Sequence, residues 1–271
     1  LARSQFSYDD VNETVKNILE DVKKRGDKAL LEYIEKFDKV KLDLLEVTND
    51  EIEYAYKTID EELLEVIKYS HDNIKKYHEK QVRNNFIMSE DNGVILGQII
   101  NPIEKVGLYV PGGTASYPST VLMNAIPAKI AGCKEIIMVT PPNIDGSISP
   151  SILASAKIAG VDRIFKVGGS QSIAALSYGT ESIPKVYKIV GPGNIYVSMA
   201  KKMVYGEVSI DMIAGPSEVL IIADNSANYV HVTADLLSQA EHDKLAACIL
   251  VTTSEELANN VEKELEKQLK E

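Results

Sequence analysis

From residue 105 onward, short apolar segments alternate with segments of helical spacing, and this alternation constrains the fold more than any other feature of the sequence. The apolar segments have the length of strands and lie at residues 106–110, 135–140, 163–167, 186–190, 218–223 and 247–251. Helices are expected between them, beginning near Ser119, Ser149, Ser170, Asn194 and Ser226. Strands interleaved with helices pair in parallel, with helices on both faces of the sheet. The sequence therefore predicts an α/β fold.

Residues 1–80 have a different pattern, that of amphipathic helices. Apolar side chains recur at helical spacing after Ser7 until Gly26, and again over residues 27–37. Thr48 and Glu51 have the spacing of a capping box, which favours a helix start. A helical segment is therefore expected to precede the α/β part.

A longer helix is predicted over residues 61–80, and a β-hairpin follows it. Asn92-Gly93 lies between the apolar segments 86–88 and 94–96, and it supplies the positive φ angles that a tight turn requires. Farther along, Gly132 and Gly160 are expected to end helices.

The composition is typical of a globular protein in water. Among 271 residues, 29 are Lys or Arg and 40 are Asp or Glu, which gives a net charge of −11. A pI near 5.0 argues against a general nucleic-acid binder. No apolar segment approaches the ~20 residues of a membrane span. The two cysteines, Cys133 and Cys248, are interpreted as structural, and their low number suits a reducing compartment, so a cytoplasmic protein is expected.

Four glycine-containing loops follow predicted strands, at residues 110–114, 167–171, 191–194 and 214–218. The ligand crevice of an open α/β sheet lies beyond the carboxyl ends of its strands, and glycine lets backbone N–H groups approach a phosphate closely. The usual dinucleotide fingerprint is absent, because the sixth position of the segment that begins Gly191-Pro192-Gly193 is Tyr196. For any single loop, the commoner role of such a glycine is only to turn the chain, but four such loops together predict a small-molecule crevice.

Among the four histidines, only His242 has a suggestive setting. Helical spacing places Asp235, Gln239 and His242 on one face of a helix. Imidazole nitrogen and side-chain oxygen atoms are acceptable zinc ligands. On spacing alone, a solvated polar helix end is the commoner meaning of such a pattern.

Five motifs carry a more specific signal, and they occur in the order KVGLYVPGG, VGGSQSIAALSYGT, GPGN, IAGPSEVLIIAD and DLLSQAEHD. At these motifs the sequence resembles the histidinol dehydrogenase family, and the resemblance runs from the early DVKKRGDKALLEYIEKFDK to about Val251. It implies oxidation of L-histidinol to L-histidine through histidinal, in histidine biosynthesis, with NAD and Zn²⁺ as cofactors. The resemblance also implies that two hydrides pass in succession to two NAD molecules, and that the zinc holds the substrate without taking part in the redox step.

The same resemblance assigns roles to six residues. NAD contacts are implied for Tyr109, Gln171 and Asn194, a substrate contact for Ser217, and joint zinc and substrate contacts for Gln239 and His242. No catalytic residue is assigned within this chain. The family's Glu-His acid-base pair and its remaining zinc ligands lie after the part of the family's sequence that this chain resembles. With two of four ligands zinc should bind weakly, and loss of an acid-base group lowers a rate by roughly 10² to 10⁴. The chain alone is therefore expected to be inactive.

For the fold, the resemblance implies two incomplete Rossmann-like parallel-sheet units, the second inserted in the first. Residues 1–106 would form a helical lead-in and the first part of a discontinuous α/β domain, residues 107–217 the NAD-binding domain, and residues 218–271 the return to the first domain. The intact enzyme would be a homodimer that acts on L-histidinol, without nucleic-acid or membrane partners.

Two alternatives stay open at this point. The chain can be a nucleotide-binding module with no chemistry of its own, which a Glu-His pair further along the gene would exclude. It can also belong to an enzyme of the same family that oxidises another alcohol, such as a sulfonated diol. Ser217, Gln239 and His242 alone do not decide between these substrates.

Overall fold

A computed structural model describes residues 8–112, 117–213, 218–241 and 246–270 of the chain. It divides into two compact units, Leu1–Ile213 and Ala214–Glu271, here called unit 1 and unit 2. Each unit is described by itself.

Unit 1 is built around a sheet of five parallel strands in the order β5-β4-β3-β6-β7. The strands are β3 (Lys105–Tyr109), β4 (Glu135–Thr140), β5 (Arg163–Lys166), β6 (Lys188–Val190) and β7 (Ser209–Ile210). The first strand in sequence, β3, is central, with β4 and β5 on one side and β6 and β7 on the other. The direction of strand addition therefore reverses between β3 and β6, as in Rossmann-like sheets.

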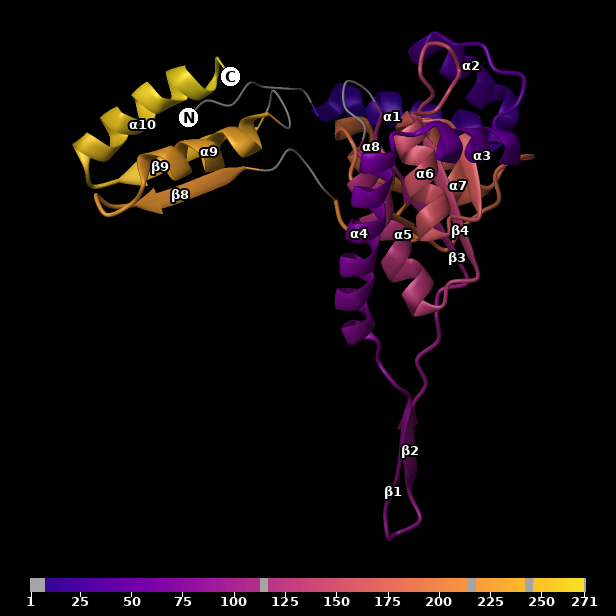
Figure 1. Cartoon of the computed structure of the whole chain (residues 1–271). Coiled ribbons are helices and arrows are strands. Elements are labelled where there is room, and N and C mark those ends of the chain that lie inside the picture. The colour runs from indigo at the N-terminus through magenta and orange to yellow at the C-terminus, as the bar shows by residue number, and fades with distance from the viewer. Residues whose placement is uncertain (1–7, 113–116, 214–217, 242–245, 271) are drawn as a thin grey trace. The chain divides into compact units, whose positions relative to one another are not determined.

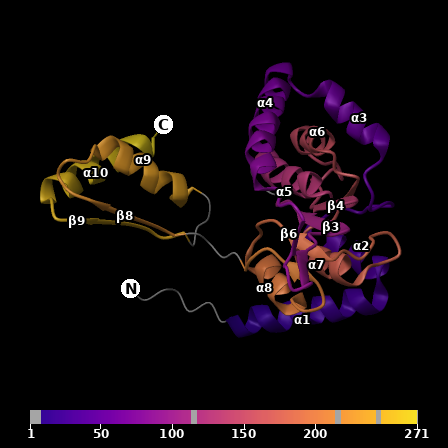
Figure 2. The ribbon, with the colours of Figure 1, turned by 90° about the horizontal axis from the view of Figure 1, so that it is seen from below.

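Helices cover both faces of this sheet (Figure 2). One face packs on α3 (Asn49–Thr58), α4 (Glu61–His78), α5 (Pro118–Ala131) and α6 (Pro150–Ala159). The other face packs on α1 (Tyr8–Arg25), α2 (Asp27–Phe37), α7 (Gly169–Tyr178) and α8 (Ile195–Val204). Alternate residues of β3 divide between the two cores: Val106 and Leu108 enter the first, and Tyr109 enters the second.

Local sequence signals explain where several helices begin and end. Thr48 and Glu51 form the predicted capping box at the start of α3. Gly132 and Gly160 end α5 and α6 in the left-handed conformation, as predicted. Pro150 occupies the first position of α6, where its missing N–H leaves no hydrogen bond unmade.

A β-hairpin extends from unit 1 beyond α4 and the 3-10 turn η1 (Glu79–Gln81) (Figure 1). Its antiparallel strands are β1 (Phe86–Ser89) and β2 (Ile95–Gln98), and Gly93 has φ 87° in the connecting turn. Every residue of both strands is exposed, including large apolar side chains.

Unit 2 contains two parallel strands, β8 (Val219–Ala223) and β9 (Cys248–Thr252), and two helices, α9 (Tyr229–Ala240) and α10 (Glu255–Gln268). The helices and one face of the strand pair form a small core around Val232, Leu236, Leu257 and Val261. Alternate residues along both strands are exposed. The sequence predicted helices on both faces of every strand, and the described part of this pair is covered on one face only.

The predicted α/β class is confirmed, with helices first and parallel strands after them. The predicted division into residues 1–106, 107–217 and 218–271, with the last segment returning to the first domain, stays a prediction. None of the helices in the described ranges combines the length and the apolar character that crossing a membrane needs. Cytoplasmic location likewise stays a prediction.

Candidate functional site

A cavity of about 1220 Å³ in unit 1 lies where the strand order reverses. Tyr109 at the carboxyl end of β3 and Asn194 after β6 both line it, and α1, the end of α2, the loop after β4 and the start of α7 complete its walls. Ligand sites in open α/β sheets form at this reversal point. The volume suits an extended ligand such as a dinucleotide, since ligand pockets are typically about 300–1,000 Å³.

Tyr109 forms the floor of the cavity and is only 3% exposed. Its hydroxyl accepts a hydrogen bond from the Gly169 N–H at 3.4 Å, which joins the end of β3 to the start of α7. Burial raises the pKa of Tyr109 to about 12, so the phenol stays protonated and keeps its O–H donor. Gln171, in the first turn of α7, also lines the cavity and is 2% exposed.

Asn194 caps α8 at the cavity wall. Its side-chain oxygen accepts hydrogen bonds from the N–H groups of Tyr196 and Val197, each at 3.1 Å. The capping bonds occupy the oxygen and leave the amide NH₂ group to donate. Asn194 therefore offers donors, and not acceptors, to a ligand.

A buried ion pair anchors the loop that precedes Asn194. Lys201, with a side chain 2% exposed, pairs with Asp211 and donates to the Gly191 carbonyl oxygen at 2.9 Å. Asp211 in turn accepts from the Gly191 N–H at 2.8 Å. Both backbone groups of Gly191 are thus held by one charged pair, which fixes the position of the loop.

The glycines of these loops are required mainly because the loops pack closely on one another. A Cβ at Gly191, where φ is +116°, would lie 2.1 Å from the Tyr109 carbonyl oxygen. A Cβ at Gly112 or Gly168 would lie 2.5 or 2.6 Å from side-chain atoms of Pro141. Glycine therefore lets three strand-end loops converge around the cavity.

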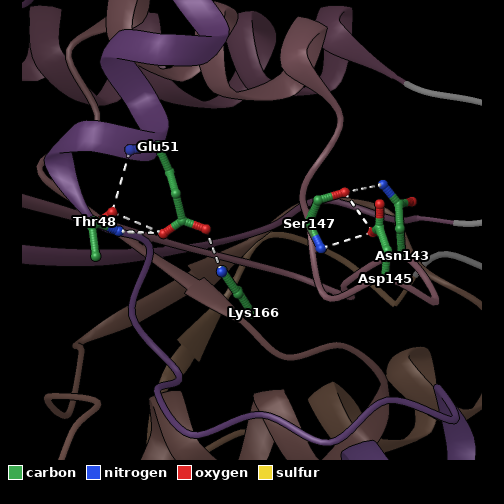
Figure 3. A network of polar contacts seen from close by, with 6 residues as sticks. All are labelled: Thr48, Glu51, Asn143, Asp145, Ser147 and Lys166. Carbon is green, nitrogen blue, oxygen red and sulfur yellow. Dashed lines mark hydrogen bonds and ion pairs between the residues drawn. The ribbon is translucent and has the colours of Figure 1, made fainter.

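The loop after β4 forms a cavity wall that sequence reasoning missed. It contributes Pro141, Pro142, Asn143, Ile144 and Asp145 to the lining. Asp145 accepts from the backbone N–H and the hydroxyl of Ser147 at 2.9 and 2.6 Å, and Asn143 donates to the same hydroxyl at 3.2 Å (Figure 3). The other loops were identified by a glycine that closely follows a predicted strand. The loop after β4 also follows a strand, but it has no glycine at its start, so the sequence analysis did not single it out.

A second group in Figure 3 ties the helical segment to the sheet edge. Glu51 accepts from the Thr48 N–H at 2.8 Å and pairs with Lys166 at the end of β5. These contacts, and the Lys166 side chain in particular, lower the pKa of Glu51 against the opposing effect of burial. The pair connects the start of α3 to the sheet edge.

Asp38 is the second lining group that the sequence did not reveal. It follows the last residue of α2, and its Oδ2 atom is buried without a hydrogen-bond partner among the described residues. Burial raises the pKa of Asp38 to about 6. Phe37, beside it, also lines the cavity and is 48% exposed.

The cavity wall at the start of α7 has a different electrostatic character from Asp38. Gly168 precedes α7 and supplies no capping side chain, and the Gly169 N–H in the first turn donates to the Tyr109 hydroxyl. With the partial positive charge of the helix start, this wall favours an anion. The cavity therefore has a donor-rich wall at α7 and α8 and an acidic group at the end of α2.

The six sequence-predicted residues divide between the two units. Tyr109, Gln171 and Asn194 meet in the cavity of unit 1. Gln239 lies on α9 in unit 2, half-buried and one turn after Asp235. Ser217 and His242 lie outside the described residues, as does most of the fourth glycine loop.

The described residues do not assemble a metal centre. No group of three or more His, Cys, Asp or Glu side chains close enough to hold a metal occurs among them. Gln239 supplies one candidate oxygen ligand, so the described donor set is too small for the zinc site that the resemblance implies. Burial raises the pKa of Cys133, which agrees with a structural thiol.

Comparison with known proteins gives the family. The family model described as histidinol dehydrogenase matches residues 1–271. The chain belongs to the histidinol dehydrogenase family. The chain is 56% identical over 260 residues to the histidinol dehydrogenase of Clostridium acetobutylicum, covering 96% of the chain and 60% of that relative. It is 58% identical over 260 residues to that of Streptococcus mutans, again covering 96% and 60%.

A solved structure agrees with the sequence relatives. The crystal structure of histidinol dehydrogenase from Elizabethkingia anophelis matches with a TM-score of 0.91 and 44% identity, covering 100% of this chain and 62% of that one. The chain thus spans about three fifths of the length of the curated relatives it matches. Because dehydrogenases pass hydride to an acceptor, membership of this family implies a redox cofactor.

Proposed function

We propose that this chain forms the NAD-binding portion of an enzyme that oxidises L-histidinol to L-histidine. The observation that carries the proposal is the convergence of Tyr109, Gln171 and Asn194 on one cavity at the reversal point of the sheet. These residues come from three separate strand-end segments. The family of the chain supports a dehydrogenase of histidine biosynthesis.

The cavity walls suit the chemical groups of NAD. The pyrophosphate is an anion, and the start of α7, where Gly168 supplies no capping side chain, offers a positive helix end to it. The Asn194 amide and the protonated Tyr109 hydroxyl add hydrogen-bond donors. Apolar lining from Ile18 and Ile144 suits the bases. When bound, NAD accepts the hydride, and the residues of this chain hold and orient it.

Zinc and substrate binding are proposed for unit 2. The proposed ligands are Gln239 and His242, with Ser217 as a further substrate contact, and these assignments rest on the motifs. Because the described residues supply only one of these ligands, no step of the reaction is derived through the metal. Without the family's later Glu-His pair, we propose that the chain alone binds NAD but does not turn over L-histidinol.

The test measures binding and turnover separately. NAD binding to the 271-residue chain is measured by isothermal titration calorimetry, and NAD reduction is followed with added Zn²⁺ and L-histidinol. Gln171→Ala should weaken NAD binding by about tenfold or more, because it removes hydrogen bonds at a buried position. Gln81→Ala, at an exposed position of η1 outside the cavity lining, is the matched control and should bind NAD normally.

Each outcome has a defined meaning. Binding without turnover, beside turnover by the Clostridium acetobutylicum relative, supports the proposal. Failure of the wild-type chain to bind NAD overturns the assignment of the cavity. Turnover by the chain alone overturns the claim of inactivity. Turnover of a sulfonated diol but not of L-histidinol, once the chain is extended to the length of its relatives, would overturn the proposal that L-histidinol is the substrate.

We also propose that two copies of the chain associate through the hairpin. Ile87 and Ile95 are 79% and 70% exposed on β1 and β2, and a free two-stranded hairpin is only marginally stable in water. Size-exclusion chromatography with light scattering should show a dimer, and a variant with Ile87→Lys and Ile95→Lys should be a monomer. Leu44→Lys, at another exposed apolar side chain, is the control and should stay dimeric. A monomeric wild type, or a dimeric hairpin variant, contradicts the proposal.

A further inference from the structure

We propose that Asp38 accepts hydrogen bonds from the ribose hydroxyls of the adenosine half of the dinucleotide, and that it thereby selects NAD over its 2′-phosphorylated form. This inference rests on the proposed NAD site and adds a residue outside the five strand-end motifs, in the segment 21–39 where the resemblance begins. Asp38 lines the same cavity as Tyr109, Gln171 and Asn194.

The first argument is the unmet hydrogen bonding of the carboxylate. The Oδ2 atom is buried and has no partner within the described part of the chain. Buried polar atoms are nearly always hydrogen-bonded, so an exception in a cavity wall points to a ligand group. An ionised carboxylate only accepts, so the group that satisfies it must donate. In a dinucleotide, the ribose hydroxyls are donors of this kind.

The second argument is that Asp38 is unfavourably placed for stability alone. It caps the carboxyl end of α2, where the partial negative charge of the helix repels a carboxylate. Lys39, which follows, has φ +60°, and it is the only residue other than glycine with positive φ in the described ranges. Burial opposes the charge as well, and holds the pKa of the carboxyl near 6. Strained backbone conformations and destabilising side-chain placements of this kind concentrate at ligand sites.

The third argument is the distribution of charge around the cavity. The donor-rich starts of α7 and α8 suit the pyrophosphate, whereas a carboxylate at the end of α2 repels it. The exposed ring of Phe37 adjoins Asp38 and lines the same cavity, so a base can pack on the ring while its ribose contacts the carboxylate. A carboxylate that accepts from the 2′-hydroxyl disfavours a 2′-phosphate by charge repulsion.

The test compares NAD and NADP binding by calorimetry at pH 7.5 for wild type, Asp38→Asn and Asp43→Asn. Asp43 is exposed and outside the cavity lining, so its variant controls for loss of one negative charge. Asp38→Asn should weaken NAD binding by about 10- to 100-fold, as expected for loss of a charged hydrogen bond. It should also lower the preference for NAD over NADP by at least about tenfold. Asp43→Asn should change neither value.

Two further measurements locate the contact. ADP-ribose should lose affinity for Asp38→Asn to the same extent as NAD, while nicotinamide mononucleotide should not. If only the mononucleotide loses affinity, or if the NAD to NADP preference is unchanged in a variant with wild-type circular dichroism, the inference is wrong. If wild type binds no NAD, the proposed function itself fails, and this result is distinct from a failure at Asp38.

Discussion

The two parallel strand groups of this molecule have similar apolar sequences and different surroundings. In unit 1, residues 136–140 of β4 are buried, because helices pack on both faces of the sheet. In unit 2, every second residue of β8 and β9 is exposed and the others are only partly buried, and Ile222 is 77% exposed. An apolar run therefore predicts a strand reliably but does not show how many faces of it will be covered.

The same contrast separates the candidate functions. The covered sheet positions four strand-end loops around one cavity. The strand pair of unit 2 positions α9 with Gln239, which alone does not make a metal site. Ligand binding can thus be tested on the described structure of unit 1, whereas zinc binding depends on residues outside the described ranges.

The largest expected effect is in the covered sheet. Phe165 on β5 is fully buried, so Phe165→Ala should lower the free energy of unfolding by about 3–5 kcal/mol. Hydrogen exchange measured by mass spectrometry should show faster exchange in peptides of unit 1 and no change in those of unit 2. Equal acceleration of exchange in both units would show that they unfold together. The contrast between the covered sheet of unit 1 and the strand pair of unit 2 would then not extend to stability.

A smaller loss is expected when one partner of the buried ion pair is removed. Lys201→Met should lower the free energy of unfolding by about 2–3 kcal/mol, since it leaves the Asp211 charge unpaired. The Asp211 side chain is 27% exposed, and the remaining solvent reduces the loss. Lys202→Met, at the exposed neighbouring position, is the control in urea unfolding. Similar losses in both variants would show that the pair contributes nothing specific.

The next effect depends on pH. Because the folded pKa of Asp38 is about 6 against an ordinary value of 3.8, the carboxyl group destabilises the folded state increasingly as the pH rises from 3.8 to 6, and fully above that range. Asp38→Asn should therefore be more stable than wild type by about 1 kcal/mol at pH 8, after allowance for solvent screening, and this contribution should vanish near pH 4. Urea unfolding at several pH values measures the difference, with Asp43→Asn as the charge control. A constant difference from pH 4 to 8 would contradict the burial of the carboxylate.

The smallest stability effect is expected on the uncovered face of unit 2. Ile222→Lys should change the free energy of unfolding by less than about 0.5 kcal/mol, because the side chain has few contacts to lose. Ile221→Lys is the matched variant on the opposite face, which packs on α9 and α10, and it should unfold unit 2. Hydrogen exchange of unit 2 distinguishes them. Large effects at both positions would show that the exposed face is covered in solution.

The features predictable from sequence were those determined locally. The capping box at Thr48 and the helix ends at Gly132 and Gly160 depend on a few adjacent residues, and all three were predicted. The length of β4 followed from one continuous apolar segment. By contrast, β7 is two residues long and is formed by pairing with β6, a long-range contact that leaves no periodic pattern.

The candidate site was predictable in part for the same reason. Tyr109, Gln171 and Asn194 occur in motifs at strand ends. The resemblance of these motifs to the family and the position of the residues after strands both identified them. Asp38 and Thr14 come to the cavity because α1 and α2 pack against α7 and α8, and no local signal reports this packing. The roles of the first three residues in binding stay predictions until NAD binding is measured.

Every described residue that lines the cavity lies between Thr14 and Tyr196, well inside unit 1. The residues that form the described cavity can therefore be retained during evolution whether or not unit 2 changes. Mutations that accumulate after residue 213 can alter the chemistry of a descendant while leaving the cavity residues intact.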